Sequence, residues 1–347
     1  MKNRLVFLTI FFLIFGVNVK AQTFQSVVID TILKDKISIR AISVAEGKIY
    51  FAGDKSRVGY VLCPKNESMI NAEIVSDTLV YEYRSIATNG NDVFALSIGN
   101  PARLHKFSKG LLGKSLVYEE MHEKVFYDSM QFWNEKEGIA IGDPTENCLS
   151  LLITRDGGNT WKKTDCQNLP KIVDGEAAFA ASNTNIVLKG NHAWIVTGGK
   201  KARVFHSNDR GKSWEVYETP IVQGETMTGI FTADFYDEKL GFIAGGNYEK
   251  PTQNFQNKAI TKDGGKTWDL IGENTGFGYA SCVQFVPKSK GKGIVSVGAS
   301  GLQYSADGGN TWKQFVTDPT LYTIRFLDED TAFAAGKDKI IKIEFKK

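Results

Sequence analysis

The sequence predicts an all-β fold, a seven-bladed β-propeller. One eight-residue motif occurs four times, beginning at Thr154, Ser207, Thr261 and Ser305. The copies are 53, 54 and 44 residues apart, and a period of about 50 residues is typical of propellers and other repeat architectures. Short apolar segments alternate with turns rich in Gly, Asn and Asp, which favours strands over helices.

A longer pattern precedes each copy of the motif and gives the order of the strands. An apolar strand that ends in an aromatic residue is followed by a polar turn and by a strand of small residues that closes on Gly. With the motif and its flanking strands, each unit is a four-stranded antiparallel meander. Seven such units around an axis bury both faces of every sheet. In chain order the pattern occupies residues 40–54, 84–100, 129–143, 176–199, 232–246, 282–298 and 323–337.

The two ends of the mature chain are expected to close the ring. The last unit ends with residues 340–347 and lacks an outer strand, whereas residues 24–32 form an apolar strand that belongs to no unit. Pairing of residues 24–32 with the last blade removes an exposed sheet edge, which would otherwise recruit other chains. We therefore expect one propeller domain over residues 22–347, closed by its N-terminal strand, and a monomer.

Residues 1–21 have the three parts of a secretory signal peptide. Lys2 and Arg4 precede an apolar run, and Val19 and Ala21 occupy the small-residue positions before a cleavage site. The apolar run is too short for a good membrane span. We expect cleavage after Ala21 and export of the mature protein to the periplasm or the cell exterior.

Composition and motifs exclude several function classes. The formal net charge is +3, with both signs mixed along the chain, which gives no indication of nucleic-acid binding. The His residues are scattered and no C-x-x-C pair occurs, so no metal or haem site is expected. Dinucleotide, P-loop and nucleophile-elbow motifs are absent from the sequence, and no cofactor is expected.

The four motif copies are interpreted as locks for a tight turn. The first Ser or Thr and the Asp can bond the backbone of their own turn, the Gly accepts backbone angles closed to other residues, and the Trp covers the hairpin. Four copies of one acid, on turns that point away from the axis, cannot all serve one catalytic site. We therefore assign a structural role to Asp156, Trp161, Asp209, Trp214, Asp263, Trp268, Asp307 and Trp312.

The motif resembles the Asp-box, or BNR repeat, of sialidases and related propellers, because every copy matches [S/T]-x-D-x-G-x-[T/S]-W. The longer stretch "GIAIGD…LLITRDGGNTW", from Gly138 to Trp161, is similar to the repeat unit of the photosystem II stability/assembly factor family. That resemblance implies an exported propeller with an assembly or scaffold role and protein partners. It does not identify the client of this chain.

A candidate binding face is expected at the tunnel mouth, where the innermost strands begin. Arg57, Arg103 and Arg203 each follow a Gly by four residues on equivalent loops and would form a basic arc. Such an arc either holds an anionic group, such as a carboxylate, a phosphate or an acidic protein loop, or is a solvated rim of charges. The candidates on this face are Arg40, Arg57, Arg84, Arg103, Tyr127, Asp128, Asp143, Glu176, Lys200, Arg203, Tyr248, Tyr279 and Tyr322.

Two functions are open for this face. The first is a non-enzymatic scaffold that binds a protein partner, which the lack of catalytic motifs favours. The second is a carbohydrate-active propeller, either glycan-binding or a sialidase-like glycoside hydrolase with arginines, a Tyr/Glu nucleophile pair and an acid. Against a sialidase, the Arg-Ile-Pro motif is absent and sialidases usually have one blade fewer. The residues available for the sialidase roles are Arg40, Arg84, Tyr127, Glu176 and Asp128.

The hairpin around the first motif copy predicts one disulfide. If Thr154 faces Trp161 across the turn, paired residue numbers sum to 315, and Cys148 and Cys166 sum to 314. The two cysteines then lie opposite or nearly so, in the third and fourth strands of one blade and within bonding reach. The cysteines expected to be unpaired are Cys63 and Cys282.

Overall fold

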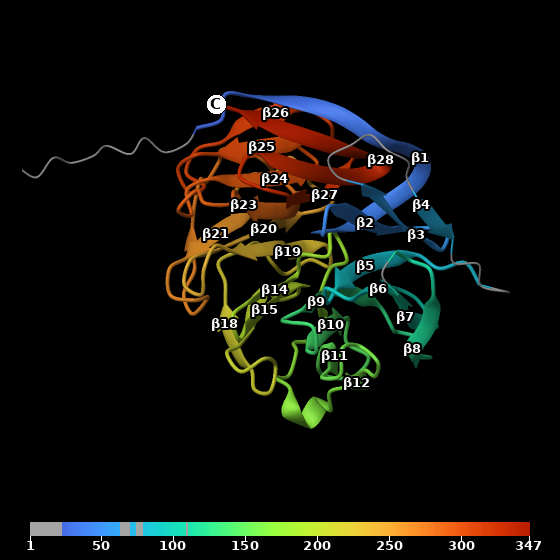
Figure 1. Cartoon of the computed structure of the whole chain (residues 1–347). Helices are drawn as coiled ribbons and strands as arrows, with labels where there is room; N and C mark the ends of the chain where they lie inside the picture. Colours follow the sequence, from blue (N-terminus) through green and yellow to red (C-terminus); the bar gives the residue numbers. More distant parts are fainter. Residues whose placement is uncertain (1–22, 63–69, 74–78, 109) are drawn as a thin grey trace, which may run out of the picture.

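The computed structural model describes residues 23–62, 70–73, 79–108 and 110–347, whose regular structure is almost entirely β-strand (Figure 1). Within these residues there is no α-helix, and the one exception to the strands is a 3-10 turn, η1 (Cys166–Asn168). No helix in this part of the chain has the length and hydropathy that a membrane crossing requires. The predicted signal peptide, residues 1–21, lies outside the described residues.

Four of the sheets are four-stranded antiparallel meanders, the architecture of propeller blades. The first strands of neighbouring sheets contact one another, which places them innermost around the axis. In spatial order the four sheets are β5 (Tyr83–Thr88), β6 (Asp92–Ser97), β7 (Ala102–Ser108) and β8 (Lys114–Glu120); β9 (Tyr127–Phe132), β10 (Gly138–Gly142), β11 (Ser150–Thr154) and β12 (Lys162–Lys163); β14 (Ile186–Lys189), β15 (His192–Val196), β17 (Arg203–Ser207) and β18 (Glu215–Glu218); and β23 (Ala280–Phe285), β24 (Ile294–Gly298), β25 (Leu302–Ser305) and β26 (Lys313–Val316).

The two other sheets are six-stranded. One contains, in spatial order, β27 (Leu321–Phe326), β28 (Thr331–Lys346), β1 (Ser26–Ala45), β2 (Lys48–Gly53), β3 (Arg57–Leu62) and β4 (Ile70–Glu73). The other contains β13 (Glu176–Ala177), β16 (Gly198–Gly199), β19 (Thr228–Phe235), β20 (Gly241–Asn247), β21 (Lys258–Thr261) and β22 (Asp269–Leu270). In this second sheet, β13 and β16 extend an ordinary blade beyond its innermost strand β19.

Counted as hydrogen-bonded sheets of the described residues, the propeller has six blades, so the expectation of seven separate blades is wrong. The reason lies in two long strands. The first part of β1 pairs with β28 and its second part pairs with β2, without a break between them. The strand β28 reverses at Asp338 (φ 64°), which brings the Phe345 N–H to 2.7 Å from the Asp330 carbonyl. The first and last repeat units therefore share one continuous sheet.

The N-terminal strand closes the ring, as the sequence predicts (Figure 1). The first part of β1 runs antiparallel to the end of β28, with Val27 opposite Phe345. Phe24, just before the strand, is buried, and its ring centroid lies 5.1 Å from that of Tyr304 and 4.9 Å from that of Phe345. Backbone pairing and aromatic packing together hold the start of the domain.

The aromatic-then-Gly pattern of the repeat has a packing reason. Phe132 at the end of β9 lies opposite Gly138 at the start of β10, and Phe235 lies opposite Gly241 in the same way. A Cβ atom on Gly138 would lie 2.7 Å from the Phe132 ring, closer than a real Cβ approaches its neighbours. Gly therefore lets the aromatic ring lie across the second strand and fill the core between sheets.

The four Asp-box turns, each running from the Ser or Thr of the motif to its Trp, share one set of internal hydrogen bonds. In the first turn the Gly158 N–H donates to Thr154 Oγ1 (3.0 Å). Thr160 donates to the Asp156 carboxylate from its N–H (3.0 Å) and its hydroxyl (2.7 Å). Because each carboxylate bonds its own turn, these aspartates lock hairpins. Equivalent bonds occur in the turns of Asp209, Asp263 and Asp307.

The tryptophans of the Asp-box turns cover the hairpins. The Trp161 ring packs edge-on against Phe94 of the neighbouring sheet, with centroids 6.3 Å apart. The indole N–H of Trp268 donates to the Gly265 carbonyl of its own turn (2.9 Å). The same bond from indole N–H to the Gly carbonyl is made in the turns of Trp214 (3.3 Å) and Trp312 (2.9 Å).

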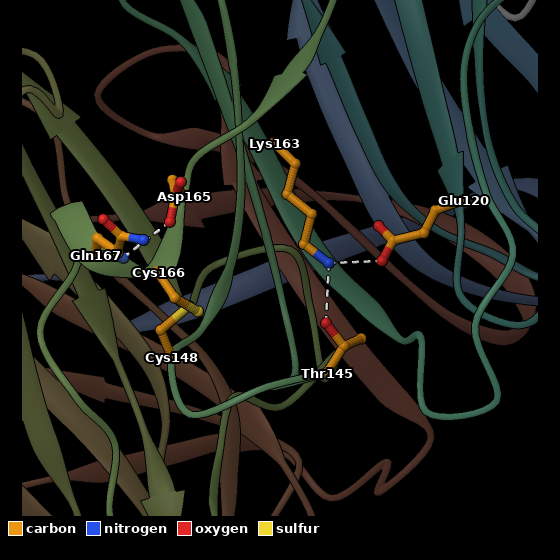
Figure 2. Close-up of a disulfide and its surroundings, with 7 residues drawn as sticks. All are labelled: Glu120, Thr145, Cys148, Lys163, Asp165, Cys166 and Gln167. Atoms are coloured by element: carbon orange, nitrogen blue, oxygen red, sulfur yellow. Dashed lines mark hydrogen bonds and ion pairs between the residues drawn. A yellow bond between two sulfur atoms is a disulfide. The ribbon is translucent and has the colours of Figure 1, made fainter.

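The hairpin register expected from the first motif copy is the observed one. Leu152 pairs with Lys163, so paired numbers sum to 315. Cys148 and Cys166 form a disulfide with Cα atoms 5.6 Å apart (Figure 2). Cys166 lies in η1, just after the short strand β12, rather than in the fourth strand itself. Of the other cysteines, Cys282 is buried and unpaired, and Cys63 lies outside the described residues.

Candidate functional site

An irregular segment, residues 178–185, leaves the sheets near the axis of the propeller. It lies between β13 and β14, and every residue in it except Phe179 is buried. The sequence explains the departure, because the repeat pattern at residues 176–199 is seven to nine residues longer than in the other units. We call residues 178–185 the plug.

Asn183 bonds the plug to two sheets. Its side-chain Nδ2 donates to the Ile86 carbonyl of β5 (2.9 Å), and its Oδ1 accepts from the Met130 N–H of β9 (3.0 Å). Both partners belong to innermost strands, and Asn183 is buried. One side chain therefore holds the plug against two neighbouring sheets through two buried hydrogen bonds.

Other plug residues bond three further innermost strands. Arg325 of β27 donates to the Ser182 carbonyl (3.1 Å), and the Ser182 hydroxyl donates to the Ser281 carbonyl of β23. The Thr184 and Thr232 hydroxyls, the latter in β19, are 2.8 Å apart. A segment that bonds β5, β9, β19, β23 and β27 at once lies on the axis. The plug therefore closes the central tunnel part-way along its length.

A pocket of about 350 Å³ lies on one side of the plug. We call it the mouth pocket, because it is formed where the innermost strands begin. Four of the predicted candidates, from three sheets, line it together. They are Arg40, Tyr248, Tyr279 and Tyr322, joined by Ser281, Pro251 and Pro319 among others.

Arg40 is the cation of the mouth pocket. Its guanidinium carbon lies 4.3 Å from the centroid of the Tyr322 ring, and its Nη1 donates to the Ala181 carbonyl of the plug (3.4 Å). Its Nε is buried without a hydrogen-bond partner, and no described carboxylate forms an ion pair with it. The charge is therefore oriented by an aromatic face and a carbonyl but has no counter-ion.

An aromatic cluster forms the adjoining wall. Tyr248 is 48% exposed and meets Tyr279 edge-on at a centroid distance of 5.0 Å. Tyr279 meets Phe231 edge-on at 4.8 Å, and Phe231 stacks on Phe179 of the plug at 4.0 Å. Burial raises the pKa of Tyr279, so its hydroxyl stays neutral. The two phenylalanines were not predicted. The extra length of residues 176–199 was a signal for Phe179 but not for Phe231.

The predicted basic arc does not consist of free cations. Arg103, for example, lies directly opposite Glu119 in the antiparallel pair β7–β8 and bonds it. Lys200 donates to the Gly224 carbonyl (2.8 Å) rather than facing the mouth pocket as a free charge. Charges neutralised within the chain offer little to an anionic ligand. The ion pairs of the arc are Arg57–Asp35, Arg103–Glu119 and Arg203–Glu176, and the further candidate Arg84 pairs with Glu82.

The residues available for a sialidase nucleophile pair have other partners. The Tyr127 hydroxyl donates to Glu120 (2.6 Å), which also accepts from Lys163 (2.5 Å), the contact drawn in Figure 2. Glu176 accepts from Arg203 Nε (3.0 Å) in a separate cluster. With six sheets the blade count no longer argues against a sialidase. The separate partners of Tyr127 and Glu176 argue against a sialidase, because the nucleophile pair is not assembled.

Two neighbouring acids near this face are Asp128, which is buried, and Asp143, which is half-buried. Asp128 is fully buried, and neither carboxylate oxygen has a hydrogen-bond partner among the described residues. Asp143 accepts from the Ala178 N–H of the plug (2.9 Å). Burial raises the pKa of Asp128 well above its usual range, and the neighbouring Asp143 adds to the rise. Burial also raises the pKa of Asp143, to about 7, so burial favours the protonated form of both acids.

Comparison with known proteins shows which family and which solved structures this chain resembles. Residues 117–227 match the family model described as Photosynthesis system II assembly factor YCF48. The solved structure of YCF48 bound to D1 peptide is 14% identical, with a TM-score of 0.64 over 94% of this chain and 99% of that chain. YCF48 from Cyanidioschyzon merolae is 13% identical, with a TM-score of 0.63 over 92% and 98%. The chain is thus similar to YCF48 in sequence over residues 117–227 and in its overall fold.

The family resemblance expected from the sequence is therefore confirmed. No curated protein sequence matches the chain. The WD40 repeats of RRP9 superpose equally well, with 9% identity and a TM-score of 0.64 over 93% of this chain and 100% of that chain. At such identities structural matches establish the fold alone. The binding site of this chain has to be identified from its own residues.

Proposed function

We propose that this YCF48-like propeller is an exported, non-enzymatic scaffold that binds a segment of a protein partner in the mouth pocket. The observation that carries the proposal is Arg40, whose charge is held without a counter-ion beside three tyrosines. Arg and Tyr are the residue types that contribute most to protein interfaces. A protein partner is further supported by the compared YCF48 structure, which is bound to a D1 peptide.

The shape of the mouth pocket favours an inserted side chain or chain end. The plug closes the tunnel behind Arg40, so a ligand enters from one side and stops there. Pro251, Pro319 and the half-exposed Tyr248 form part of the surrounding surface. A partner would place one group in the pocket and lay its neighbouring residues across these apolar contacts.

Export is the second part of this proposal. It is supported by the signal-peptide pattern of residues 1–21 and by the Cys148–Cys166 disulfide, since disulfides persist in oxidising compartments. Mass spectrometry of the N-terminus of the natural protein would test it, with a mature chain beginning at Gln22 as the expected result. A chain that retains Met1 in the cytoplasm would contradict export.

Partner capture by matched variants tests the mouth pocket. Purified wild-type protein, Arg40→Gln, Tyr248→Ala and Lys200→Gln are cross-linked to the host envelope fraction. Arg40→Gln and Tyr248→Ala are expected to weaken capture about tenfold or more, because each removes a buried or central contact. Lys200→Gln makes the same charge change outside the pocket and should bind as wild type. Undiminished capture by a folded Arg40→Gln/Tyr248→Ala double variant would contradict the proposal.

A glycan is the second candidate ligand of the mouth pocket. The half-exposed Tyr248 ring favours it, because the apolar face of a sugar packs well on an aromatic ring. A soluble-glycan screen with wild-type and Tyr248→Ala protein distinguishes the two ligands. Turnover of a fluorogenic sialoside that is abolished by Arg84→Ala would reverse the preference for a protein partner.

A further inference from the structure

The far side of the plug holds two adjoining pockets of about 250 and 170 Å³. Both are lined by Gln131 and Arg325, so they form one hollow around the tunnel axis, with plug residues Asn183 and Thr184 as its floor. This hollow, which we call the far cup, opens where the innermost strands end, opposite the mouth pocket. Its polar side chains include Ser43, Thr88, Gln131, Lys189, Asp234 and Arg325.

The wall of the far cup is fixed by bonds between neighbouring sheets. Gln131 of β9 donates to the Ile186 carbonyl of β14 (2.8 Å). Asp234 of β19 accepts from its neighbour Phe235 (2.9 Å) and from the Phe285 N–H of β23 (2.7 Å). The wall is therefore preorganised, and both carboxyl oxygens of Asp234 are engaged by backbone N–H groups.

Arg325 is a fixed charge at the floor of the far cup. Its guanidinium donates to the carbonyls of Ile324 (2.7 Å), Ser182 (3.1 Å) and Asn183 (3.3 Å). These acceptors orient the group but are neutral, and no described carboxylate forms an ion pair with it. The carbonyls use its terminal N–H groups, so Arg325 contributes mainly positive potential to the cup.

Lys189 provides the far cup with hydrogen-bond donors that no described residue occupies. Its ammonium group forms no hydrogen bond or ion pair within the described residues, although it lines the same 170 Å³ pocket as Arg325. Burial raises the pKa of Asp234, and both Lys189 and Arg325 act against that rise, which places the two cations in reach of one group. Two cations thus face a small polar cup whose one carboxylate is already engaged.

We propose that the far cup is a second binding site of this protein and takes a small anionic group, a carboxylate or a phosphate. Lys189 would donate hydrogen bonds to the anion and Arg325 would supply a fixed charge, in a confined site where both act more strongly than in water. The site goes beyond the proposed function, because the plug separates it from the mouth pocket. An anion held there is either a free small molecule or an acidic group of a second partner.

Calorimetric titration tests the far cup. The titrations use the full mature chain with Arg40→Gln, which removes the cation of the mouth pocket, and inorganic phosphate or a blocked tri-glutamate peptide as probes. Adding Lys189→Gln is expected to weaken binding of the probe about tenfold or more, whereas Lys200→Gln, with the same charge change, leaves it unaltered. The Lys189 ammonium makes no hydrogen bond or ion pair with any described residue, so this variant should fold even if Arg325→Gln does not.

The outcomes separate the two sources of the anion. Phosphate binding that depends on Lys189 supports a free small anion, and peptide binding that depends on Lys189 without phosphate binding supports an acidic segment of a partner. No binding of either probe at tens of millimolar, or equal binding by Lys189→Gln, would overturn the proposal. Partner capture at the mouth pocket should be unchanged by Lys189→Gln, so failure of one site is distinguishable from failure of the other.

Discussion

Asp209 holds its turn closed through both carboxylate oxygens. It accepts hydrogen bonds from the N–H groups of Lys212 and Ser213 (2.9 Å each) and from the Ser213 hydroxyl (2.6 Å). Asp209→Ala leaves these donors without their acceptor in the folded state. We expect the free energy of unfolding, measured by urea denaturation at neutral pH, to fall by about 1–3 kcal/mol.

The loss of unfolding free energy in Asp209→Ala, which we call the deficit, should depend on pH. This dependence identifies the carboxylate as the source of the deficit. Burial opposes ionisation of Asp209, but the bonds from Ser213 outweigh it and lower the pKa to about 2. A folded pKa below the unfolded value of 3.8 means that the stabilisation is present above about pH 4 and is lost as the pH falls toward 2. The deficit should therefore shrink at about pH 2.5. A deficit that stays constant with pH would contradict this account.

For Asp128 the pH dependence of the stabilisation is opposite to that of Asp209, because its folded pKa is raised. Burial, with the charge of Asp143 as the second cause, raises its folded pKa, so the folded state holds a proton that the unfolded state releases. This stabilisation is complete below about pH 4 and is lost as the pH rises. We expect Asp128→Asn, which is neutral at every pH, to be more stable than wild type at about pH 8 and closer to it at about pH 5. Identical urea stability profiles for the two proteins would contradict a protonated Asp128.

At the scale of elements, the plug is held most strongly by Asn183. Asn183→Ala removes the bonds to the Ile86 carbonyl and the Met130 N–H and leaves both groups buried without partners. We expect a loss of about 2–4 kcal/mol in the free energy of unfolding, from urea denaturation. Asn185 is a matched control, because it lies in the same plug but its side-chain amide has no described partner. Equal losses for Asn183→Ala and Asn185→Ala would contradict a specific role for Asn183.

The strands and turns could be predicted from the sequence because they are set locally. The Asp-box turn fixes its hairpin register, and the register alone is enough to pair Cys148 with Cys166. The plug could not be placed in the same way. Its polar bonds connect residues as far apart in sequence as Ser182 and Thr323, and only the closed ring brings such residues together.

The candidate site could be predicted only in part, because some of its features follow from the repeat and others depend on how strands pair. Arg40 and the tyrosines lie at the starts of innermost strands or on a long loop, and those positions converge in any propeller. The arginines of the arc are engaged by carboxylates, and Arg103 faces Glu119 directly across the strand pair β7–β8. That pairing depends on the register between β7 and β8, which no Asp-box turn fixes. The arginine could therefore be identified from the sequence, but its carboxylate partner could not.

For the whole molecule, β1 decides whether the ring is closed. Its first part covers the edge of β28, and its second part continues into the sheet of β2, so one strand connects the two ends of the chain (Figure 1). This continuity is the reason that the first and last repeat units form a single sheet. A local repeat count cannot show it, because the count treats each unit as complete in itself.

Deletion of residues 22–32 should therefore open the propeller. The deletion removes the buried Phe24 and the pairs with β28 from Ser26–Lys346 to Thr31–Ile341, and it exposes a sheet edge that can pair with other chains. We expect soluble oligomers or aggregates by size-exclusion chromatography and a lower melting temperature, whereas Phe24→Ala alone should cost about 3–5 kcal/mol and leave a monomer. Val28 is 46% exposed, so Val28→Ser keeps the backbone pairing and should behave as wild type. A monomeric deletion variant with wild-type melting would show that the ring is closed by other contacts.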